Sequence, residues 1–176
     1  MNAPNIIRLV EKLPWSPSRP RWPQQRDLEK NDRVILHQSL GHADTSGNRD
    51  VFGINAYHIS PNNHISAAGC PHICYHFCLD DDGSIYQCNE LSDVVWHCKG
   101  QNSRSIGVVL VGDFAGPGHP GGEPTAAQEQ AFFVLAEHLM ATLGLPPSAF
   151  FGHCDFGKLA CPGSNAESWI KIIRSM

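Results

Sequence analysis

The sequence has no long apolar run, no large basic cluster and no low-complexity tract, and each absence excludes a class of protein. None of its apolar stretches approaches the roughly 20 residues that a membrane-spanning helix needs, so we expect no membrane insertion. The formal net charge is −4, and the densest basic cluster is Arg19 and Arg21 on either side of a proline. This charge pattern argues against nucleic acid as a partner.

The first eight residues contain no basic segment followed by an apolar stretch, so we expect no signal peptide. The sequence therefore predicts synthesis in the cytoplasm, with export or cell lysis needed if the substrate lies outside. The 176 residues are 41% hydrophobic and 17% charged, as in a soluble globular protein. We expect one domain, large enough to bury a real core, and a monomer.

Cysteine is abundant, with seven in the chain. An odd number fits one metal thiolate plus six other thiols. Those six are either reduced or joined in up to three disulfides, for example Cys70 to Cys74 or Cys88 to Cys98. The absence of a recognisable signal peptide favours reduced thiols.

Residues 1–32 hold five of the 13 prolines, together with Trp15 and Trp22. This composition predicts an irregular N-terminal arm packed on the domain, with a short helix near residues 6–12. The arm is either a strap held on the surface by its two tryptophans or a wall of a substrate groove, and we favour the strap. Residues 33–176 would form the domain itself.

The remaining pattern predicts an α/β domain with a central mixed sheet flanked by helices. Residues 33–37 form a β-branched run typical of a buried strand, and residues 106–111 form a nearly continuous apolar run typical of a central strand. Residues 73–79 and 84–88 flank an Asp-Gly turn and predict a hairpin. A long loop from residue 38 to about 69 should carry a helix at 51–60.

Two capping boxes predict where helices begin. Thr125 with Gln128 should start a helix near Ala126, and Gly144 should end it. Ser164 with Glu167 has the same spacing and should start a last helix.

His37, His153 and Cys161 form the most informative set of residues in the chain. Two imidazoles and a thiolate suit Zn²⁺, and a site with three protein ligands leaves a fourth position for water. Zinc lowers the pKa of such a water and polarises a neighbouring carbonyl. The set therefore predicts one catalytic zinc ion and the hydrolysis of an amide or ester.

A rival metal site would use the alternating cysteines and histidines of residues 70–78. Side chains on one face of a strand lie nearly 7 Å apart, whereas Zn–S bonds are about 2.3 Å long. Several of them could not bind one zinc without a bend in the strand. We therefore interpret Cys74, His76 and Cys78 as buried beneath a helix.

From about Arg33 to Gly163 the chain resembles the zinc-dependent N-acetylmuramoyl-L-alanine amidases, whose fold is shared by phage lysozyme-type amidases and peptidoglycan recognition proteins. The matching features occur in the family's order along the chain. They are the strand ending in His37, the Tyr75-His76-Phe77 strand with its hairpin, Trp96-His97 with Asn102 and the strand at Ile106, and Gly152-His153 with Cys161-Pro162-Gly163.

The resemblance implies roles for further residues. Tyr75 would lie beside the zinc and stabilise an oxyanion, and Lys158 would transfer a proton if its loop allows. His97 would bind substrate or move a proton, with Trp96 in the same loop. Asn102 would bond the peptide or cap its own turn.

Two departures from the family pattern concern proton transfer. Many members have lysine or threonine two residues before the last ligand, where this chain has Leu159. Some members have glutamate on the central strand, where this chain has Val109. The sequence therefore leaves the general acid unidentified.

The resemblance implies a peptidoglycan hydrolase that cleaves the amide between N-acetylmuramic acid and L-alanine of the stem peptide. Its partner would be peptidoglycan or a soluble muropeptide, acted on in the cell wall after lysis or export, or in the cytoplasm. A non-catalytic peptidoglycan-binding module and a zinc endopeptidase acting within the stem peptide remain alternatives.

Overall fold

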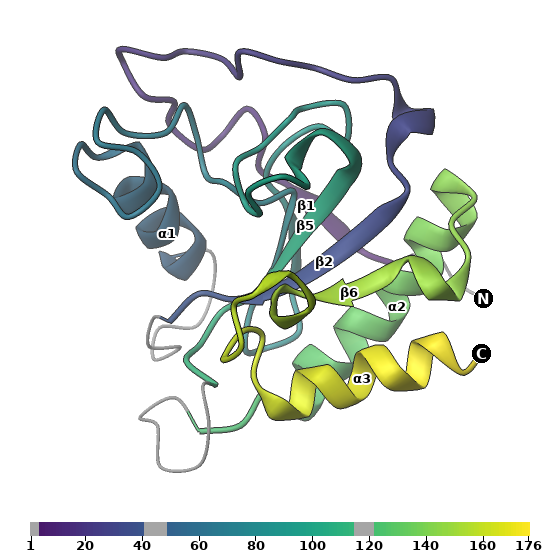
Figure 1. Ribbon diagram of the computed structural model, residues 1–176. Coiled ribbons are helices and arrows are strands. Elements are labelled where there is room, and N and C mark those ends of the chain that lie inside the picture. Colours follow the sequence, from purple (N-terminus) through teal and green to yellow (C-terminus); the bar gives the residue numbers. More distant parts are fainter. Residues whose placement is uncertain (1–3, 41–48, 115–121) are drawn as a thin grey trace.

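A six-stranded mixed sheet forms the centre of the computed structural model, which describes residues 4–40, 49–114 and 122–176 (Figure 1). The strand order is β1-β4-β3-β5-β2-β6. Only the hairpin pair β3 and β4 is antiparallel, and every other neighbouring pair is parallel. The strands are β1 Ile6–Arg8, β2 Arg33–Gln38, β3 Phe77–Leu79, β4 Ile85–Gln87, β5 Ser105–Leu110 and β6 Phe150–Gly152.

Strand β5 lies between β3 and β2, and all six of its residues are buried. A parallel strand covered on both faces is expected to be apolar throughout, which confirms the central strand predicted from residues 106–111. Strand β2 pairs with β5 along its whole length, and His37 lies opposite Val109 in that register.

Helices α2 (Ala126–Leu143) and α3 (Ser164–Arg174) cover one face of the sheet (Figure 1). Thr125 and Gln128 form the predicted capping box, and Gly144 ends α2 in the left-handed conformation. The apolar side chains of α2 and α3 pack on those of β2, β3 and β5. Among the described helices, none is both long and apolar enough to cross a membrane.

The second capping box is wrong. Gly163, with φ of 100°, is the N-cap of α3, and Ser164 is already helical. The Glu167 amide bonds to the Gly163 carbonyl instead of a serine hydroxyl. Gly163 packs so closely against the backbone of Phe114 that a side chain there would clash, so tertiary packing sets the start of this helix.

Helix α1 (Arg49–Ile59) confirms the helix predicted at 51–60 and covers part of the opposite face. Val51 from α1 packs with Tyr75 and Val109 in a second apolar cluster, to which Leu9 and Leu13 of the arm contribute. Residues 41–48 of the loop before α1 lie outside the described residues.

The short 3-10 helices are η1 Leu28–Lys30, η2 Asn102–Arg104, η3 Pro147–Ala149 and η4 His153–Phe156.

The predicted hairpin is confirmed, but its first strand begins at Phe77, not at Ile73. Backbone amides before Phe77 bond to side chains of α1: Ile73 to Asn55 (2.8 Å) and Cys74 to His58 (3.1 Å). These bonds replace strand pairing at Ile73 and Cys74, and strand-like pairing resumes at His76, whose amide bonds to the Gly107 carbonyl at 2.9 Å.

The predicted helix near residues 6–12 is wrong, because Ile6–Arg8 forms strand β1. This strand pairs in parallel with β4 at the sheet edge. Isoleucine suits a strand, and the edge of β4 supplies the backbone partners that make residues 6–8 one. Beyond β1 the arm packs on the domain, where Trp22 is buried and donates to the Asn89 side chain (2.7 Å). The predicted domain boundary at residue 32 stays a prediction.

Candidate metal centre

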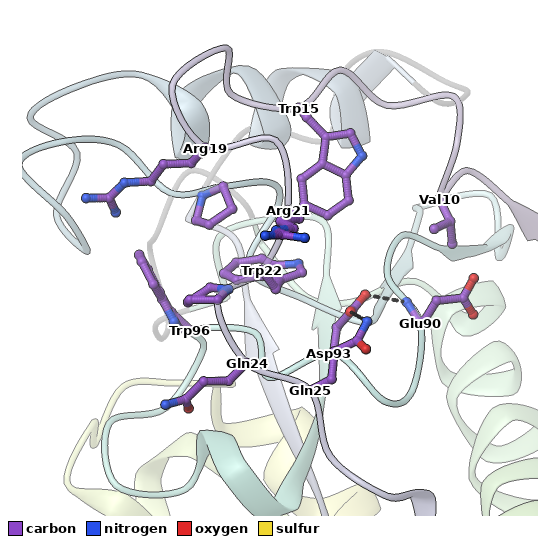
Figure 2. Close-up of a pocket in the computed structure, with 12 residues that line it drawn as sticks. Val10, Trp15, Arg19, Arg21, Trp22, Gln24, Gln25, Glu90, Asp93 and Trp96 are labelled. Carbon is purple, nitrogen blue, oxygen red and sulfur yellow. Dashed lines mark hydrogen bonds between the residues drawn. The ribbon is translucent and has the colours of Figure 1, made fainter.

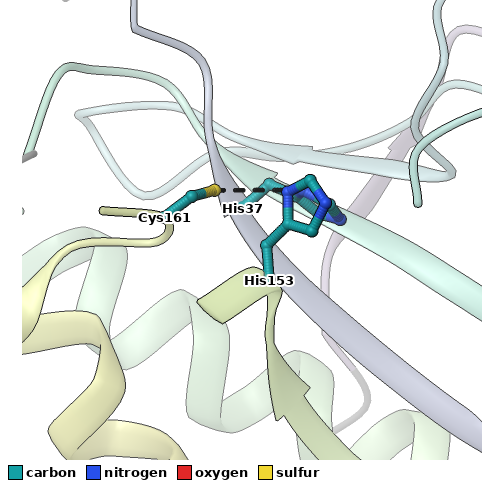
Figure 3. Close-up of side chains that lie close together, drawn as sticks. All are labelled: His37, His153 and Cys161. Atoms are coloured by element: carbon teal, nitrogen blue, oxygen red, sulfur yellow. Dashed lines mark hydrogen bonds between the residues drawn. The ribbon is translucent and has the colours of Figure 1, made fainter. Parts of the chain in front are cut away.

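The structure brings His37, His153 and Cys161 together, with one potential ligand atom from each lying within 4.8 Å of the others (Figure 3). The sheet register explains how the histidines meet. Leu36 of β2 lies opposite Gly152 of β6, so His37 and His153, one residue further on, lie side by side at the C-terminal ends of these two parallel strands. Their ring centroids are 4.4 Å apart.

Cys161 reaches the histidines because the loop after His153 closes on itself. The Cys154 amide donates to the Cys161 carbonyl at 2.7 Å, and the Gln38 side chain donates to the Ala160 carbonyl at 2.7 Å. The Cys161 sulfur then lies 4.0 Å from Nδ1 of His37 and accepts a hydrogen bond from the Gln38 amide at 3.4 Å.

A chain of hydrogen bonds determines which nitrogen of His37 is available to a metal. The Ser105 hydroxyl donates to the Gln101 carbonyl (2.8 Å), so its oxygen accepts from Nε2 of His97 (2.9 Å). Nδ1 of His97 is then an acceptor, and Nε2 of His37 donates to it at 3.0 Å. The lone pair of His37 Nδ1 is left facing Cys161. A bond of this kind on the second ring nitrogen orients metal-binding histidines.

Gly107 makes the position of His97 feasible. A side chain at Gly107 would place its Cβ 2.7 Å from Cγ of the His97 ring, so only glycine lets the imidazole lie against β5. His97 is 6% exposed. Ser105 and Gly107 of β5 thus position His97, and His97 in turn orients the ring of His37.

The electrostatics of the three residues fit a zinc site. Burial lowers the pKa of His37 well below its usual value, and burial followed by the charge of Lys158 lowers the pKa of His153 to about 4. Both imidazoles are therefore neutral at pH 7, as metal ligands must be. Burial raises the pKa of Cys161 to about 12, so metal binding must displace its proton. Two nitrogens and one sulfur at this spacing suit Zn²⁺.

Tyr75 lies beside this group, with its ring centroid 5.2 Å from that of His37. Burial, and then Cys161, raise the pKa of its phenol well above the usual value, so it remains a hydrogen-bond donor. Tyr75 also borders a cavity of about 480 Å³ whose other wall comes from α1 and the loop that follows it. In that wall the Tyr57 hydroxyl and Nδ1 of His64 are 3.0 Å apart.

Asn89 positions Tyr75 and was not identified from the sequence. Its amide nitrogen donates to the carbonyls of Ile73 (2.8 Å) and Tyr75 (2.6 Å). Its oxygen lies 2.7 Å from Nε1 of Trp22 and 3.0 Å from Nδ1 of His72. A fully buried asparagine with all these bonds satisfied ties the arm to the site. An isolated asparagine after a hairpin gives no sequence signal of this.

The other predicted site residues lie in three different surroundings. Lys158 is exposed on the loop between His153 and Cys161, and its charge affects the pKa of both. Trp96 is half-buried and points into a cavity on the arm. Asn102 accepts the Cys98 amide at 2.7 Å and so caps its own turn. Their roles in catalysis and binding stay predictions.

The two departures from the family pattern are visible at the site. Leu159 is 81% exposed on the loop before Cys161, and Val109 is fully buried opposite His37. Neither side chain can transfer a proton.

The alternating cysteines and histidines of residues 70–78 have partners of their own. His76 lies 3.1 Å from the Asp93 carbonyl and its Nδ1 accepts the Gly107 amide at 3.0 Å. The Cys78 and Cys88 sulfurs are 3.7 Å apart. All seven cysteines are free thiols in the structure, so it contains neither of the two disulfides considered from the sequence.

Comparison with known proteins identifies the family of the chain and several relatives. The family model described as N-acetylmuramoyl-L-alanine amidase matches residues 27–164. The endolysin of Enterobacteria phage K11 is 33% identical over 97 residues, which are 55% of this chain and 63% of that protein. The endolysin of Escherichia phage T7 is 28% identical over 146 residues, 83% of this chain and 89% of the relative. The first of these alignments thus spans less than two thirds of the relative.

Solved structures with the same fold include the N-acetylmuramoyl-L-alanine amidase LysCS from Clostridium intestinale, with 21% identity and a TM-score of 0.69. That match covers 97% of this chain and 95% of the other. Drosophila peptidoglycan recognition protein SD has 18% identity and a TM-score of 0.74, with coverage of 99% and 95%. The match over most of the chain and the gathered His37, His153 and Cys161 lead to one conclusion: the chain belongs to the N-acetylmuramoyl-L-alanine amidase family.

Proposed function

We propose that the protein is a zinc-dependent peptidoglycan amidase that cleaves the bond between N-acetylmuramic acid and L-alanine of the stem peptide. The observation that carries the proposal is the convergence of two neutral imidazoles and one thiol at the C-terminal ends of β2 and β6, next to a cavity bordered by a buried tyrosine. Family membership supports the bond that is cleaved.

His37, His153 and Cys161 would hold the zinc ion. Zinc held there supplies Lewis-acid polarisation of a carbonyl and lowers the pKa of a water molecule. The Ser105–His97 chain keeps Nδ1 of His37 aimed at Cys161, and the Gln38 amide stabilises negative charge on the Cys161 sulfur. The protein thus supplies a preorganised donor set.

Tyr75 would stabilise the negative charge that develops on the substrate carbonyl. Its phenol keeps its proton at neutral pH and borders the cavity next to His37. Preorganised donors of this kind contribute strongly to amide hydrolysis. Lys158 is the candidate for returning a proton to the leaving amine, because its charge already acts on His153 and Cys161.

A non-catalytic peptidoglycan-binding module is the second candidate. Val109 and Leu159 favour it, because some family members carry a glutamate at the first position and many carry a lysine or threonine at the second, groups that can transfer protons. Cys161 argues against it, because a binding module has no need of a third ligand in place.

The substrate would be cell-wall peptidoglycan or a soluble muropeptide. The matched endolysins support action on the cell wall after lysis. A zinc endopeptidase would release different products from the same substrate.

The test is mass spectrometry of purified sacculi incubated with the zinc-loaded protein. Release of stem peptides that begin at alanine, abolished by a chelator and restored by zinc, is the expected result. Cys161→Ser should abolish release, whereas Cys154→Ser, a matched change in the same loop, should preserve it. Peptides cut within the stem would indicate the endopeptidase, and intact sacculi that retain bound protein would indicate the binding module.

A further inference from the structure

A second cavity lies on the N-terminal arm (Figure 2), separate from the cavity beside Tyr75. It has a volume of about 960 Å³ and shares no lining residue with the cavity beside Tyr75. Three tryptophans line it, Trp15 and Trp22 from the arm and Trp96 from the loop before His97. We call this cavity the arm pocket.

The three indoles are held in place by their own contacts. Trp22 is 4% exposed, bonds to Asn89 and meets Trp96 edge-on at 5.4 Å between ring centroids. Trp15 stacks on His72 at 4.3 Å. Rigid aromatic walls lower the entropic cost of binding, and an indole face matches the flat C–H face of a pyranose ring.

The polar groups of the arm pocket favour a ligand with negative charge. Its two carboxylates are already engaged: Glu90 forms an ion pair with Arg8, and Asp93 accepts from Gln25 (3.3 Å) and from the Glu90 amide (3.0 Å). Arg21 is exposed and lines the pocket (Figure 2), and it pairs with no carboxylate of the described residues. Its guanidinium is therefore available to a carboxylate, which it can bind in bidentate fashion.

We propose that the arm pocket binds an amino-sugar chain that bears carboxylates, namely the glycan strand from which stem peptides have been removed. This inference rests on the proposed function. Hydrolysis of the amide adds water across the C–N bond, so the amine leaves with the peptide and the lactyl group keeps a free carboxylate. The partly exposed indoles of Trp15 and Trp96 would stack on the sugar rings, with the buried Trp22 supporting Trp96, and Arg21 would pair with that carboxylate. The protein would thus hold the intact glycan strand from which it has removed the stem peptides.

The test is calorimetric titration of the zinc-loaded protein with two peptide-free tetrasaccharides. One alternates N-acetylglucosamine and N-acetylmuramic acid and carries carboxylates; the other contains N-acetylglucosamine alone. The first should bind more tightly, and Arg21→Ala should weaken it by about tenfold, as expected for the loss of a charge-assisted hydrogen bond. Lys12→Ala, an exposed cation of the same arm outside the pocket, should leave binding unchanged.

Equal binding of the two sugars, or equal affinity of the Arg21→Ala and Lys12→Ala proteins for the carboxylated sugar, would overturn the assignment. Neither tetrasaccharide contains a stem peptide, so the measurement does not depend on turnover. Arg21-dependent binding without release of stem peptides from sacculi would refute the proposed function alone. Stem-peptide release without Arg21-dependent binding would refute the arm pocket alone.

Discussion

Tyr75 is buried and lies beside His37. Its phenol is the candidate hydrogen-bond donor to the oxyanion that forms during amide hydrolysis. Replacing it with phenylalanine keeps the ring and its packing but removes the donor. We expect Tyr75→Phe to lower kcat by about 10²- to 10³-fold, the usual cost of losing one oxyanion donor. Zinc content should not change. Turnover of a soluble muropeptide, with zinc measured on the same sample, checks this.

Tyr86→Phe is the matched control, because Tyr86 is also buried but lies on β4 away from the metal group. Its activity should equal that of the unmodified protein. Full activity of Tyr75→Phe would remove tyrosine from the mechanism while leaving the metal assignment intact.

Ser105 affects the metal only through His97 and His37. Ser105→Ala leaves Nε2 of His97 without its hydroxyl partner, so the tautomer that exposes His37 Nδ1 is less favoured. We expect zinc affinity to fall by about 10- to 100-fold, as for other changes to groups that support metal ligands. Competition with a chromophoric chelator measures it. Ser103→Ala, exposed in the adjacent turn, should have no effect.

At the scale of elements, His58 connects α1 to the segment that leads into Tyr75. Its Nδ1 accepts the Cys74 amide at 3.1 Å, and burial lowers its pKa to about 3. The unfolded pKa is about 6.5, so the unfolded chain takes up this proton first as the pH falls. The contribution of His58 to stability is complete above pH 6.5 and decreases towards pH 3.

Between pH 7 and pH 5 this residue alone should cost about 2 kcal/mol of unfolding free energy. His58→Asn keeps an acceptor for the Cys74 amide but does not titrate. The pH dependence of urea unfolding should therefore be shallower in the variant by that amount. Parallel curves for the two proteins would show that folding does not lower the pKa of His58.

At the scale of the whole molecule, the metal centre joins β2 to the end of β6 and to the loop that closes at Cys161. A ligand that binds only the folded state stabilises it by mass action. We expect a chelator to lower Tm by about 10 °C, given a tightly bound ion and a chain of this length. Thermal scans with and without zinc measure the shift.

Cys161→Ser should melt at the lower temperature with or without the chelator, because it can no longer hold the ion well. Cys154→Ser should still respond to zinc. A chelator effect of equal size in both variants would place the stabilising ion elsewhere.

The sequence by itself determined the features that depend on neighbours along the chain. Thr125, Gln128 and Gly144 predict α2 because capping bonds join residues within a turn of each other. The apolar run of β5 predicts its central place because a parallel strand covered on both faces must be apolar throughout. The residue types of His37, His153 and Cys161 predict the metal they suit, since ligand chemistry does not depend on the fold.

Only the tertiary structure decided the features that depend on distant partners. The edge of β4 makes residues 6–8 a strand, and packing against Phe114 moves the start of α3 to Gly163. His37 and His97 are 60 residues apart, yet their bond sets the tautomer that faces Cys161. Local patterns cannot report such contacts, because a buried polar group is satisfied by whichever group the fold brings beside it.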